Sequence, residues 1–279
     1  MLKSTFCHLQ GIGAGSEQKL WDAGVHSWEQ ALDAPASALG RSADKIRRGA
    51  EESLSRLQSA DAAWFGAKLP ANQQWRLFDS FRTRVAYVDI ETTGLAWPAA
   101  HITTIALYDG EQVKTYVHDR NLHEFMDDIR AYDLLVTFNG KCFDVPFIEQ
   151  ALEMRLDIGH IDLRYVFRAL GVSGGLKRIE HFYGMDRGEL EGVDGYMAVL
   201  LWKLFRRTAD EKVLETLLAY NVEDVLTLEP LMHQAYNEHL VSTPFGISGS
   251  LTIPSLAANP FSATPQVIAA ARSGGSFVC

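Results

Sequence analysis

The chain has 279 residues, of which 47% are hydrophobic and 22% charged, and its 26 basic and 35 acidic residues give a formal net charge of −9. This size predicts a globular protein with one substantial domain and a smaller one, and the acidic balance argues against a protein that coats long nucleic acid. The cysteines, Cys7, Cys142 and Cys279, are too few and scattered for a disulfide framework or zinc cluster, so we expect free thiols.

The sequence predicts neither a membrane span nor a secretory signal. The longest central apolar stretch, MAVLLWKLF, is interrupted by Lys203 and is far shorter than the ~20 residues that cross a bilayer. The N-terminus, MLKSTFCHLQGIGAGSEQ, lacks the continuous apolar core of a signal peptide. We therefore expect a cytoplasmic protein.

Residues 1–75 predict a helical N-terminal region, with helical patterns at EQKLWDAG, HSWEQAL and SADKIRRGAEESLSRLQSA. Within it, HLQGIGAGSEQKLWDAGVHSW resembles a helix-hairpin-helix motif. A Gly11-Ile-Gly13 turn of that kind presents backbone N–H groups to a phosphate. A simple helical turn is the alternative interpretation, and segment 71–84 is the expected junction to the next region.

Residues 82–240 predict an α/β domain. Strands are expected at VAYVDIE, HITTIALYD, EQVKTYVH and DLLVTFN, and the Asp109-Gly110 pair predicts an antiparallel hairpin. Helices are expected at NLHEFMDDIRAY, DVPFIEQALEM, IDLRYVFRAL, GLKRIEHFYG, GYMAVLLWKLFRR and from Asp210 to about Glu238. These elements predict a mixed sheet with helices on both faces.

Residues 241–279 change character again. They carry almost no charge, several prolines and many small residues. This composition predicts a tail without a core of its own, parts of which could dock on the body of the protein.

The first strand ends in two carboxylates. In VAYVDIETTGL, Asp89 and Glu91 lie two residues apart at the end of an apolar run. Because side chains alternate along a strand, both point to the same face and Ile90 points to the other. Two like charges on one buried face repel each other, so a positive partner is expected between them. Gly94 then permits a close backbone turn at the strand end.

Two further segments carry acids for which a purely structural role is the simplest interpretation. In LLVTFNGKCFDVPFIE, Asp144 opens a helix after the Asn139-Gly140 turn, where helix capping is the simplest role. In LLAYNVEDVLTLEPL, Tyr220 and Asp224 lie four residues apart and hence on one helical face. A core tyrosine beside a solvated acid is the simplest interpretation of that pair.

Together the three segments match, in order, the three motifs of the DnaQ-like, ribonuclease-H-like 3′–5′ exonucleases: DIETTG, N-G-x-x-F-D and Y-x-x-x-D. The segment LKRIEHFYGMDRGELEGVDG resembles the YprB-like branch of that superfamily. The resemblance covers roughly residues 85–235. It implies a ribonuclease-H-like fold, in which helices flank a mixed β-sheet.

The resemblance also implies roles for five side chains. Asp89, Glu91, Asp144 and Asp224 match the four acidic ligands of two divalent ions, Mg²⁺ or Mn²⁺. Tyr220 matches the tyrosine that orients the attacking water, which places the chain in the tyrosine type rather than the histidine type.

These residue types suit such chemistry. Hard cations prefer oxygen ligands, and two ions roughly 3.5–4 Å apart can activate a water and stabilise the departing 3′ oxygen, which yields nucleoside 5′-monophosphates. We expect Asp89 to bridge the ions, Glu91 and Asp224 to complete the nucleophile-side site, and Asp144 to hold the second ion directly or through water. Glu223 is a less suitable ligand than Asp224, because it lies about 100° away around the helix.

Substrate contacts are expected around the ends of the first and fourth strands. Leu95 could lie beside the terminal base and Phe143 could stack on a base, whereas Trp97 fits a core role equally well. Asn139 could bind a phosphate or stabilise its own turn. The expected nucleic-acid contacts are Thr92, Thr93, Gly94, Leu95, Asn139, Phe143, Gly11 and Gly13.

Three other charged residues have two open roles each. Asp162 resembles an acidic position of the same branch, which suggests a residue that supports the metal ligands without binding the metal, although a helix cap is the simpler role. Lys177 and Arg178 could meet a phosphate, although ordinary solvated charges are more common.

The sequence thus predicts a divalent-metal-dependent 3′–5′ exonuclease acting on single-stranded 3′ ends of DNA or RNA. One alternative is a non-catalytic nucleic-acid-binding module on the same fold, against which the presence of all four acids and the tyrosine argues. A second is an endonuclease that cuts within a hybrid duplex, and the Tyr-x-x-x-Asp motif favours the exonuclease over it.

Overall fold

A five-stranded mixed β-sheet forms the centre of the protein in the computed structural model, which describes residues 1–190 and 192–273. The strand order is β3-β2-β1-β4-β5. Pairing is antiparallel between β1, β2 and β3 and parallel between β1, β4 and β5. The strands are β1 (Val85–Thr92), β2 (Ile102–Tyr108), β3 (Val113–Val117), β4 (Leu134–Thr137) and β5 (Gly159–Asp162). The predicted mixed sheet and hairpin are confirmed.

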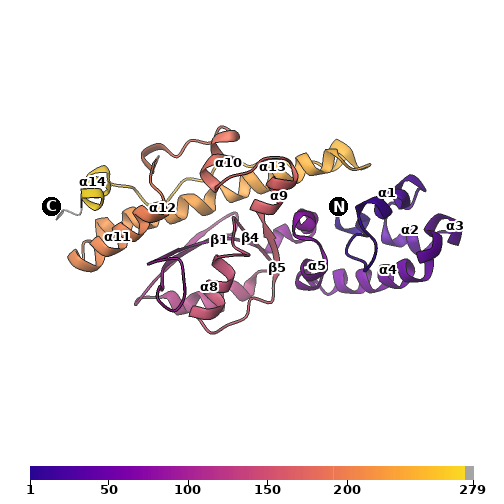
Figure 1. The fold of residues 1–279 in the computed structure, drawn as a ribbon, viewed down its shortest axis with the longest axis horizontal. Helices are drawn as coiled ribbons and strands as arrows, with labels where there is room; N and C mark the ends of the chain where they lie inside the picture. Colours follow the sequence, from indigo (N-terminus) through magenta and orange to yellow (C-terminus); the bar gives the residue numbers. More distant parts are fainter. Residues whose placement is uncertain (191, 274–279) are drawn as a thin grey trace.

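Helices cover both faces of this sheet (Figure 1). Helices α12 (Glu211–Leu226) and α13 (Leu228–Val241) run along one face, and α7 (Phe125–Asp128) and α8 (Asp144–Ala151) pack on the other. The remaining helices of the α/β region are α9 (Leu163–Ala169), α10 (Leu176–Phe182), α11 (Gly195–Thr208) and α14 (Pro265–Ser273). The fold class is therefore a mixed sheet flanked by helices, as the sequence predicts.

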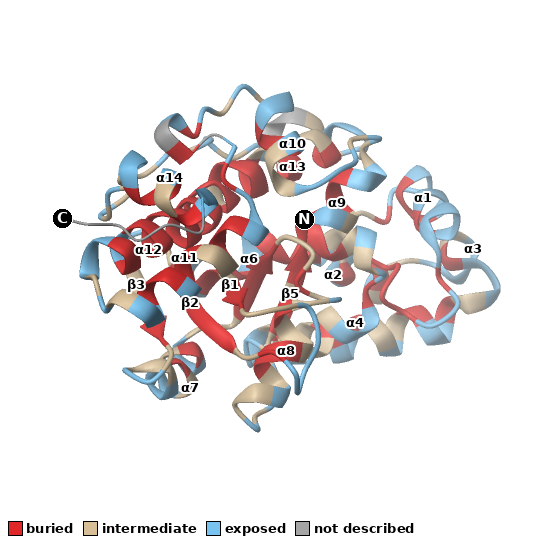
Figure 2. Cartoon of the chain, turned by 60° about the vertical axis from the view of Figure 1, so that its left-hand side comes forward, coloured by how far each residue is buried: buried red, intermediate tan, exposed pale blue. Residues whose placement is uncertain are grey.

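The alternation of β1 fixes which side chains face which helices. Val85 and Tyr87 join the core under α12 and α13, whereas Val88 and Ile90 pack with Phe147 and its neighbours on the α8 side. Figure 2 shows the strands of the sheet as mostly buried. Because side chains alternate, the two acids of β1 share the face of Val85 and Tyr87, which is the α12 face.

The N-terminal region is helical, as predicted. Its helices are α1 (Ala14–Asp22), α2 (Trp28–Asp33), α3 (Ala36–Leu39), α4 (Ala43–Gln58), α5 (Ala62–Lys68) and α6 (Phe78–Phe81), with 3₁₀ turns at Leu2–Ser4, Gly40–Ser42, Ala71–Leu77 and Arg82–Arg84. Arg76 forms a buried ion pair with Glu17 at 2.7 Å, and Trp75 stacks on His239 of α13 at 5.0 Å between ring centroids. The Trp75 stack thus joins this region to the α/β body.

Several predicted elements differ from the structure. The start of the predicted helix 161–170 belongs to β5, whose sequence GHID contains a single large apolar residue and so gives no recognisable strand pattern. The predicted helix from Asp210 is interrupted at Thr227 into α12 and α13. The predicted helix 121–132 consists of short turns, Leu122–Glu124 and Ile129–Ala131, around α7.

The tail docks on the body over its described length. Asn237 of α13 exchanges two hydrogen bonds with Leu251, each of 2.8 Å, and Thr216 of α12 accepts a bond from the backbone of Thr264 at 3.2 Å. Helix α14, which the sequence does not predict, packs on α11 and α12. In residues 1–190 and 192–273, every helix is too short or too polar to traverse a lipid bilayer.

Cys7 and Cys142 are free thiols, as predicted, with Cys7 buried and Cys142 exposed. Cys279 lies outside the described residues.

Candidate active site

Three predicted acids meet where α12 crosses the end of β1. Oxygen atoms of Asp89, Glu91 and Asp224 all lie within 4.8 Å of one another. Glu91 and Asp224 are buried and Asp89 is partly exposed. Strand alternation places the first two on the α12 face, and the buried run of α12 brings the third to them. The ladder between β1 and β2 is irregular between Glu91 and Thr92, at the point where the strand leaves the site.

The electrostatics of this acidic group favour a bound cation. Desolvation and the nearby carboxylates of Asp224 and Asp144 raise the pKa of Asp89 and of Glu91 well above their ordinary values. Desolvation also raises the pKa of Asp224, although Arg187 opposes that shift. A set of crowded carboxylate oxygens without thiol or imidazole is the donor set that hard divalent cations prefer. These residues therefore fit a divalent metal.

Asp144, the fourth predicted acid, is not among the three that meet within 4.8 Å, but it lies next to them and contacts β1. It is the first residue of α8, not its cap, and its Oδ1 accepts a hydrogen bond of 3.2 Å from the backbone N–H of Ile90. Burial raises the pKa of Asp144 to about 7, and its charge raises that of both Asp89 and Glu91. The simple capping interpretation is thus wrong, and Asp144 belongs to the same electrostatic unit.

Asn221 holds Asp89 in place. Its Nδ2 donates to Asp89 Oδ2 at 2.8 Å, and its Oδ1 accepts from Thr104 Oγ1 of β2 at 2.9 Å. Both Asn221 and Thr104 are fully buried. Asn221 was not predicted from the sequence, where the signal is a polar residue flanked by Tyr220 and Val222 in LLAYNVEDVL.

Arg187 supplies a positive charge at the edge of the acidic group. It donates to Asp224 Oδ1, and its Nε and Nη2 bind Glu180 at 2.5 and 2.8 Å. Thr227, at the break between α12 and α13, donates to Glu180 Oε1 at 2.6 Å. All four side chains are buried. This network was missed as well: Glu180 lies in the predicted helix GLKRIEHFYG and Arg187 in the segment after it, and no local spacing signals their contact.

Tyr220 and Lys177 flank the acids on the α10 side. Tyr220 is 4% exposed, and desolvation and the charges of Asp224 and Glu91 raise the pKa of its hydroxyl, which therefore stays protonated and able to donate. Lys177 Nζ lies 4.9 Å from the centroid of the Tyr220 ring. This ammonium is buried and makes no hydrogen bond within the described part of the chain. Desolvation lowers the pKa of Lys177, whereas Asp224 raises it, so Lys177 is not an ordinary solvated charge.

Glu223 points away from the acidic group. Its Oε2 accepts from Nδ2 of Asn259 in the docked tail at 3.1 Å, and the same amide group donates to the backbone of Ala219 at 2.8 Å. The choice of Asp224 over Glu223 therefore agrees with the geometry.

The segment after β1 exposes two large apolar side chains. Thr92 Oγ1 donates to the backbone of Gly94 at 2.6 Å, and Thr93 Oγ1 accepts from the backbone of His101 at 3.0 Å, so both threonines shape the turn. Leu95 is 88% exposed and Trp97 42% exposed. An exposed leucine directly after the acidic strand is available to a substrate.

Asp162 braces the loop that carries the second motif. It caps α9 by accepting from the backbone of Arg164 at 3.0 Å, as predicted, and it also accepts from the backbones of Asn139 at 2.8 Å and Lys141 at 3.0 Å. Asn139 adopts a positive φ of 68°, and its Oδ1 accepts from Arg164 at 2.5 Å. Asn139 is thus part of the turn, next to Gly140, where a Cβ would lie 2.3 Å from Thr137 Oγ1.

The other expected substrate contacts lie on two different parts of the molecule. Phe143 is half-buried against Phe147, with 5.7 Å between ring centroids, beside the second motif. Gly11 and Gly13 lie in the N-terminal region, where Gly11 has a φ of 82° and Gly13 precedes α1 as its cap. The Lys45 ammonium approaches Gly11, since a Cβ there would be 3.2 Å from its Nζ.

Comparison with known proteins gives one family. Residues 86–236 match the family model described as the RNase H superfamily. Among solved structures, the chain is similar to the family B DNA polymerase from the hyperthermophilic archaeon Pyrobaculum calidifontis, with 18% sequence identity and a TM-score of 0.42 over 56% of this chain and 24% of that chain. No curated protein sequence matches the chain.

Proposed function

This chain belongs to the RNase H superfamily, and we propose that it is a divalent-metal-dependent 3′–5′ exonuclease that releases nucleoside 5′-monophosphates from single-stranded nucleic acid. The observation that carries the proposal is the meeting of Asp89, Glu91 and Asp224 within 4.8 Å, with Tyr220 on the same helical face as Asp224. None of these groups identifies a nuclease by itself, but together they match the site of a nuclease of this type.

The four acids would hold two ions, Mg²⁺ or Mn²⁺. When bound, such ions activate water and stabilise negative charge on the phosphate and the leaving oxygen. Asp89 would contribute to the binding of both ions, and Asn221 fixes its Oδ2. Glu91 and Asp224 would hold the ion on the nucleophile side, and Asp144 the other.

The remaining groups would orient the reactants. The protonated Tyr220 hydroxyl would hold the attacking water by a hydrogen bond. The Lys177 ammonium, buried beside Tyr220 without a hydrogen-bonding partner among the described residues, would bind the scissile phosphate. The exposed Leu95 would lie against the terminal base, with the backbone of Thr92 to Gly94 beside it and Phe143 stacking nearby.

The N-terminal turn would bind nucleic acid at a distance from the acids. Gly11 and Gly13 would present backbone N–H groups, and Lys45 adds positive charge next to Gly11. A simple helical turn remains the alternative for this segment.

The test is a digestion of matched single-stranded DNA and RNA, each labelled at the 5′ end, with Mn²⁺. A 3′–5′ exonuclease shortens the labelled strand stepwise and releases 5′-monophosphates. Asp89→Asn serves as the inactive control. Product that persists in this variant would overturn the proposal, and the comparison of DNA with RNA identifies the substrate.

A circular single strand separates the proposed activity from an endonuclease. An exonuclease leaves a circle intact, whereas an enzyme that cuts internally linearises it. Binding of linear strands without any product under these conditions would instead indicate a non-catalytic module.

A further inference from the structure

A cavity of about 620 Å³ lies between the end of β4, α9 and α10. Phe138 and Asn139, which follow β4, form one wall, and Arg164 and Arg168 of α9 form another. The glycine-containing loop that ends at Gly175 and the first turns of α10 close it. Asn139, at the rim, belongs to an exonuclease motif, and the other residues that line the cavity do not.

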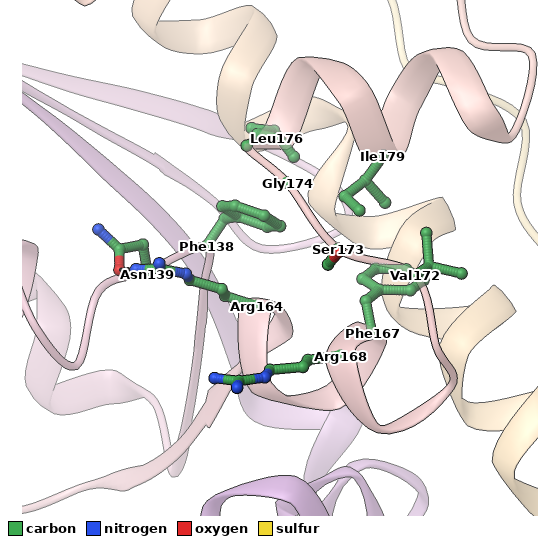
Figure 3. A pocket seen from close by; sticks show the side chains of 11 residues that line it. Phe138, Asn139, Arg164, Phe167, Arg168, Val172, Ser173, Gly174, Leu176 and Ile179 are labelled. Atoms are coloured by element: carbon green, nitrogen blue, oxygen red, sulfur yellow. Dashed lines mark hydrogen bonds between the residues drawn. The ribbon is translucent and has the colours of Figure 1, made fainter.

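The walls combine positive charge with apolar surface. Arg164 and Arg168 lie one helical turn apart and are exposed, and Figure 3 shows both side chains extending towards the side of Asn139. The half-buried ring of Phe138 also lines the cavity, and in Figure 3 it points away from Asn139, towards Phe167 and Ile179, which add apolar surface. Guanidinium groups bind phosphate and aromatic rings stack on bases, so this lining fits a nucleotide.

Helix α10 connects the cavity to the catalytic acids. Leu176 and Ile179 line the cavity, whereas Lys177 lies over the Tyr220 ring and Glu180 holds Arg187 against Asp224. One helix therefore has the cavity on one side and the acidic group on the other. A strand whose 3′ end reaches the acids would pass this cavity within a few nucleotides.

We propose that this cavity binds an internal nucleotide of the substrate strand, upstream of the 3′ end. Its base stacks on Phe138, and its phosphates bind Arg164 and Arg168. The inference rests on the proposed exonuclease function and adds a subsite to it. A free mononucleotide shares the same chemistry, so the experiment must distinguish the two sources.

The experiment measures binding of 5′-fluorescein-labelled single strands of 2, 4, 8 and 12 nucleotides by fluorescence anisotropy, in an Asp89→Asn background that prevents hydrolysis. The test variant is Arg164→Ala/Arg168→Ala. The matched control is Arg130→Ala/Arg155→Ala, which removes the same charge from exposed arginines elsewhere. Thermal melting verifies that both variants fold.

We expect the test variant to bind the 8-mer and 12-mer at least about tenfold more weakly than the control variant. The slope of log affinity against log salt should fall by about 1.4, because each phosphate contact on a single strand contributes about 0.7. The dinucleotide should show a smaller loss than the longer strands. As a second variant, Phe138→Leu should weaken the 8-mer on the order of fivefold through lost stacking.

Two outcomes would overturn the inference. One is that the test and control variants have equal affinities and salt slopes. The other is that a free nucleoside 5′-monophosphate fills the cavity in preference to the strand, so that the arginine substitutions abolish mononucleotide binding and leave 8-mer binding unchanged. Hydrolysis by the unsubstituted protein is assayed in parallel with Mn²⁺. Activity together with either outcome leaves the exonuclease proposal standing, whereas inactivity contradicts the exonuclease proposal itself.

Discussion

Arg187 binds two acids at once: its Nη2 donates to both Asp224 and Glu180, and its Nε donates to Glu180. All three side chains are buried. The guanidinium therefore offsets part of the repulsion in the acidic group and fixes one oxygen of Asp224. Glu180 belongs to α10, Asp224 to α12, and Thr227 to the break between α12 and α13, so Arg187 also joins these elements.

Removal of this guanidinium should destabilise the protein. Arg187→Met leaves buried carboxylates uncompensated, and we expect the free energy of unfolding to fall by about 3–5 kcal/mol. Urea denaturation in the presence of EDTA measures this free energy of unfolding. The matched control is Arg206→Met, which breaks an exposed pair with Asp119 and should cost no more than about 1 kcal/mol. Equal losses in the two variants would contradict a structural role for the network.

Neutralisation of Asp89 should abolish metal-dependent hydrolysis. Asp89→Asn keeps the shape of the side chain but removes a charge from the centre of the acidic group, so it should fold normally and show no product with Mg²⁺ or Mn²⁺. Stopped digestions resolved by length provide the measurement. Asp157→Asn removes an exposed acid at another site and should retain full activity.

Removal of the Tyr220 hydroxyl should slow the reaction without affecting folding. Tyr220→Phe preserves the buried ring and removes only its donor, so we expect a fall in turnover of about 10²-fold with little change in melting temperature. The comparison is Tyr196→Phe, whose ring is 69% exposed. A Tyr220→Phe enzyme with unchanged turnover would exclude the tyrosine from the reaction.

Divalent metal should stabilise the folded protein, because ions relieve the repulsion among Asp89, Glu91 and Asp224 and bind only the folded site. At a concentration 100 times the Kd, the gain is about 2.7 kcal/mol, which differential scanning calorimetry would detect as a higher melting temperature with Mn²⁺. Asp89→Asn should lose most of this gain. If Mn²⁺ leaves the melting temperature unchanged, these carboxylates do not form a metal site.

His8 should make the N-terminal region sensitive to acid. Burial lowers the pKa of His8 to about 3, and its Nε2 lies 2.7 Å from Ser53 Oγ. Below the ordinary histidine pKa of ~6.5 the unfolded chain binds a proton that the folded chain does not, so stability falls as the pH drops from about 6.5 towards 3.

The measurement is urea denaturation of the unsubstituted protein and His8→Gln between pH 7 and pH 4. The unsubstituted protein should lose up to about 3 kcal/mol more than the variant over this range. His123→Gln, at an exposed position, should show the same pH dependence as the unsubstituted protein. Parallel curves for the His8 variant and the unsubstituted protein would rule out this titration.

Local periodicity accounts for much of what could be predicted. The alternation of β1 and the four-residue spacing on α12 have fixed geometries, so the shared faces of Asp89 with Glu91 and of Tyr220 with Asp224 follow from the sequence. Short or irregular elements were not predicted, because they depend on contacts with distant parts of the chain. Strand β5 has four residues and depends on its pairing with β4, and α14 is helical where the tail packs on α11 and α12.

The sequence by itself determined the mixed α/β fold, the faces of the acids and the order of the motifs, because these depend on neighbours within one or two helical turns. Only the tertiary structure decided that Asn221 holds Asp89, 132 positions away, that Arg187 binds Asp224 across 37, and that a nucleotide-sized cavity lies behind α10. Such contacts arise when whole elements pack to bury their apolar faces, and no local spacing specifies which polar side chains that packing brings together.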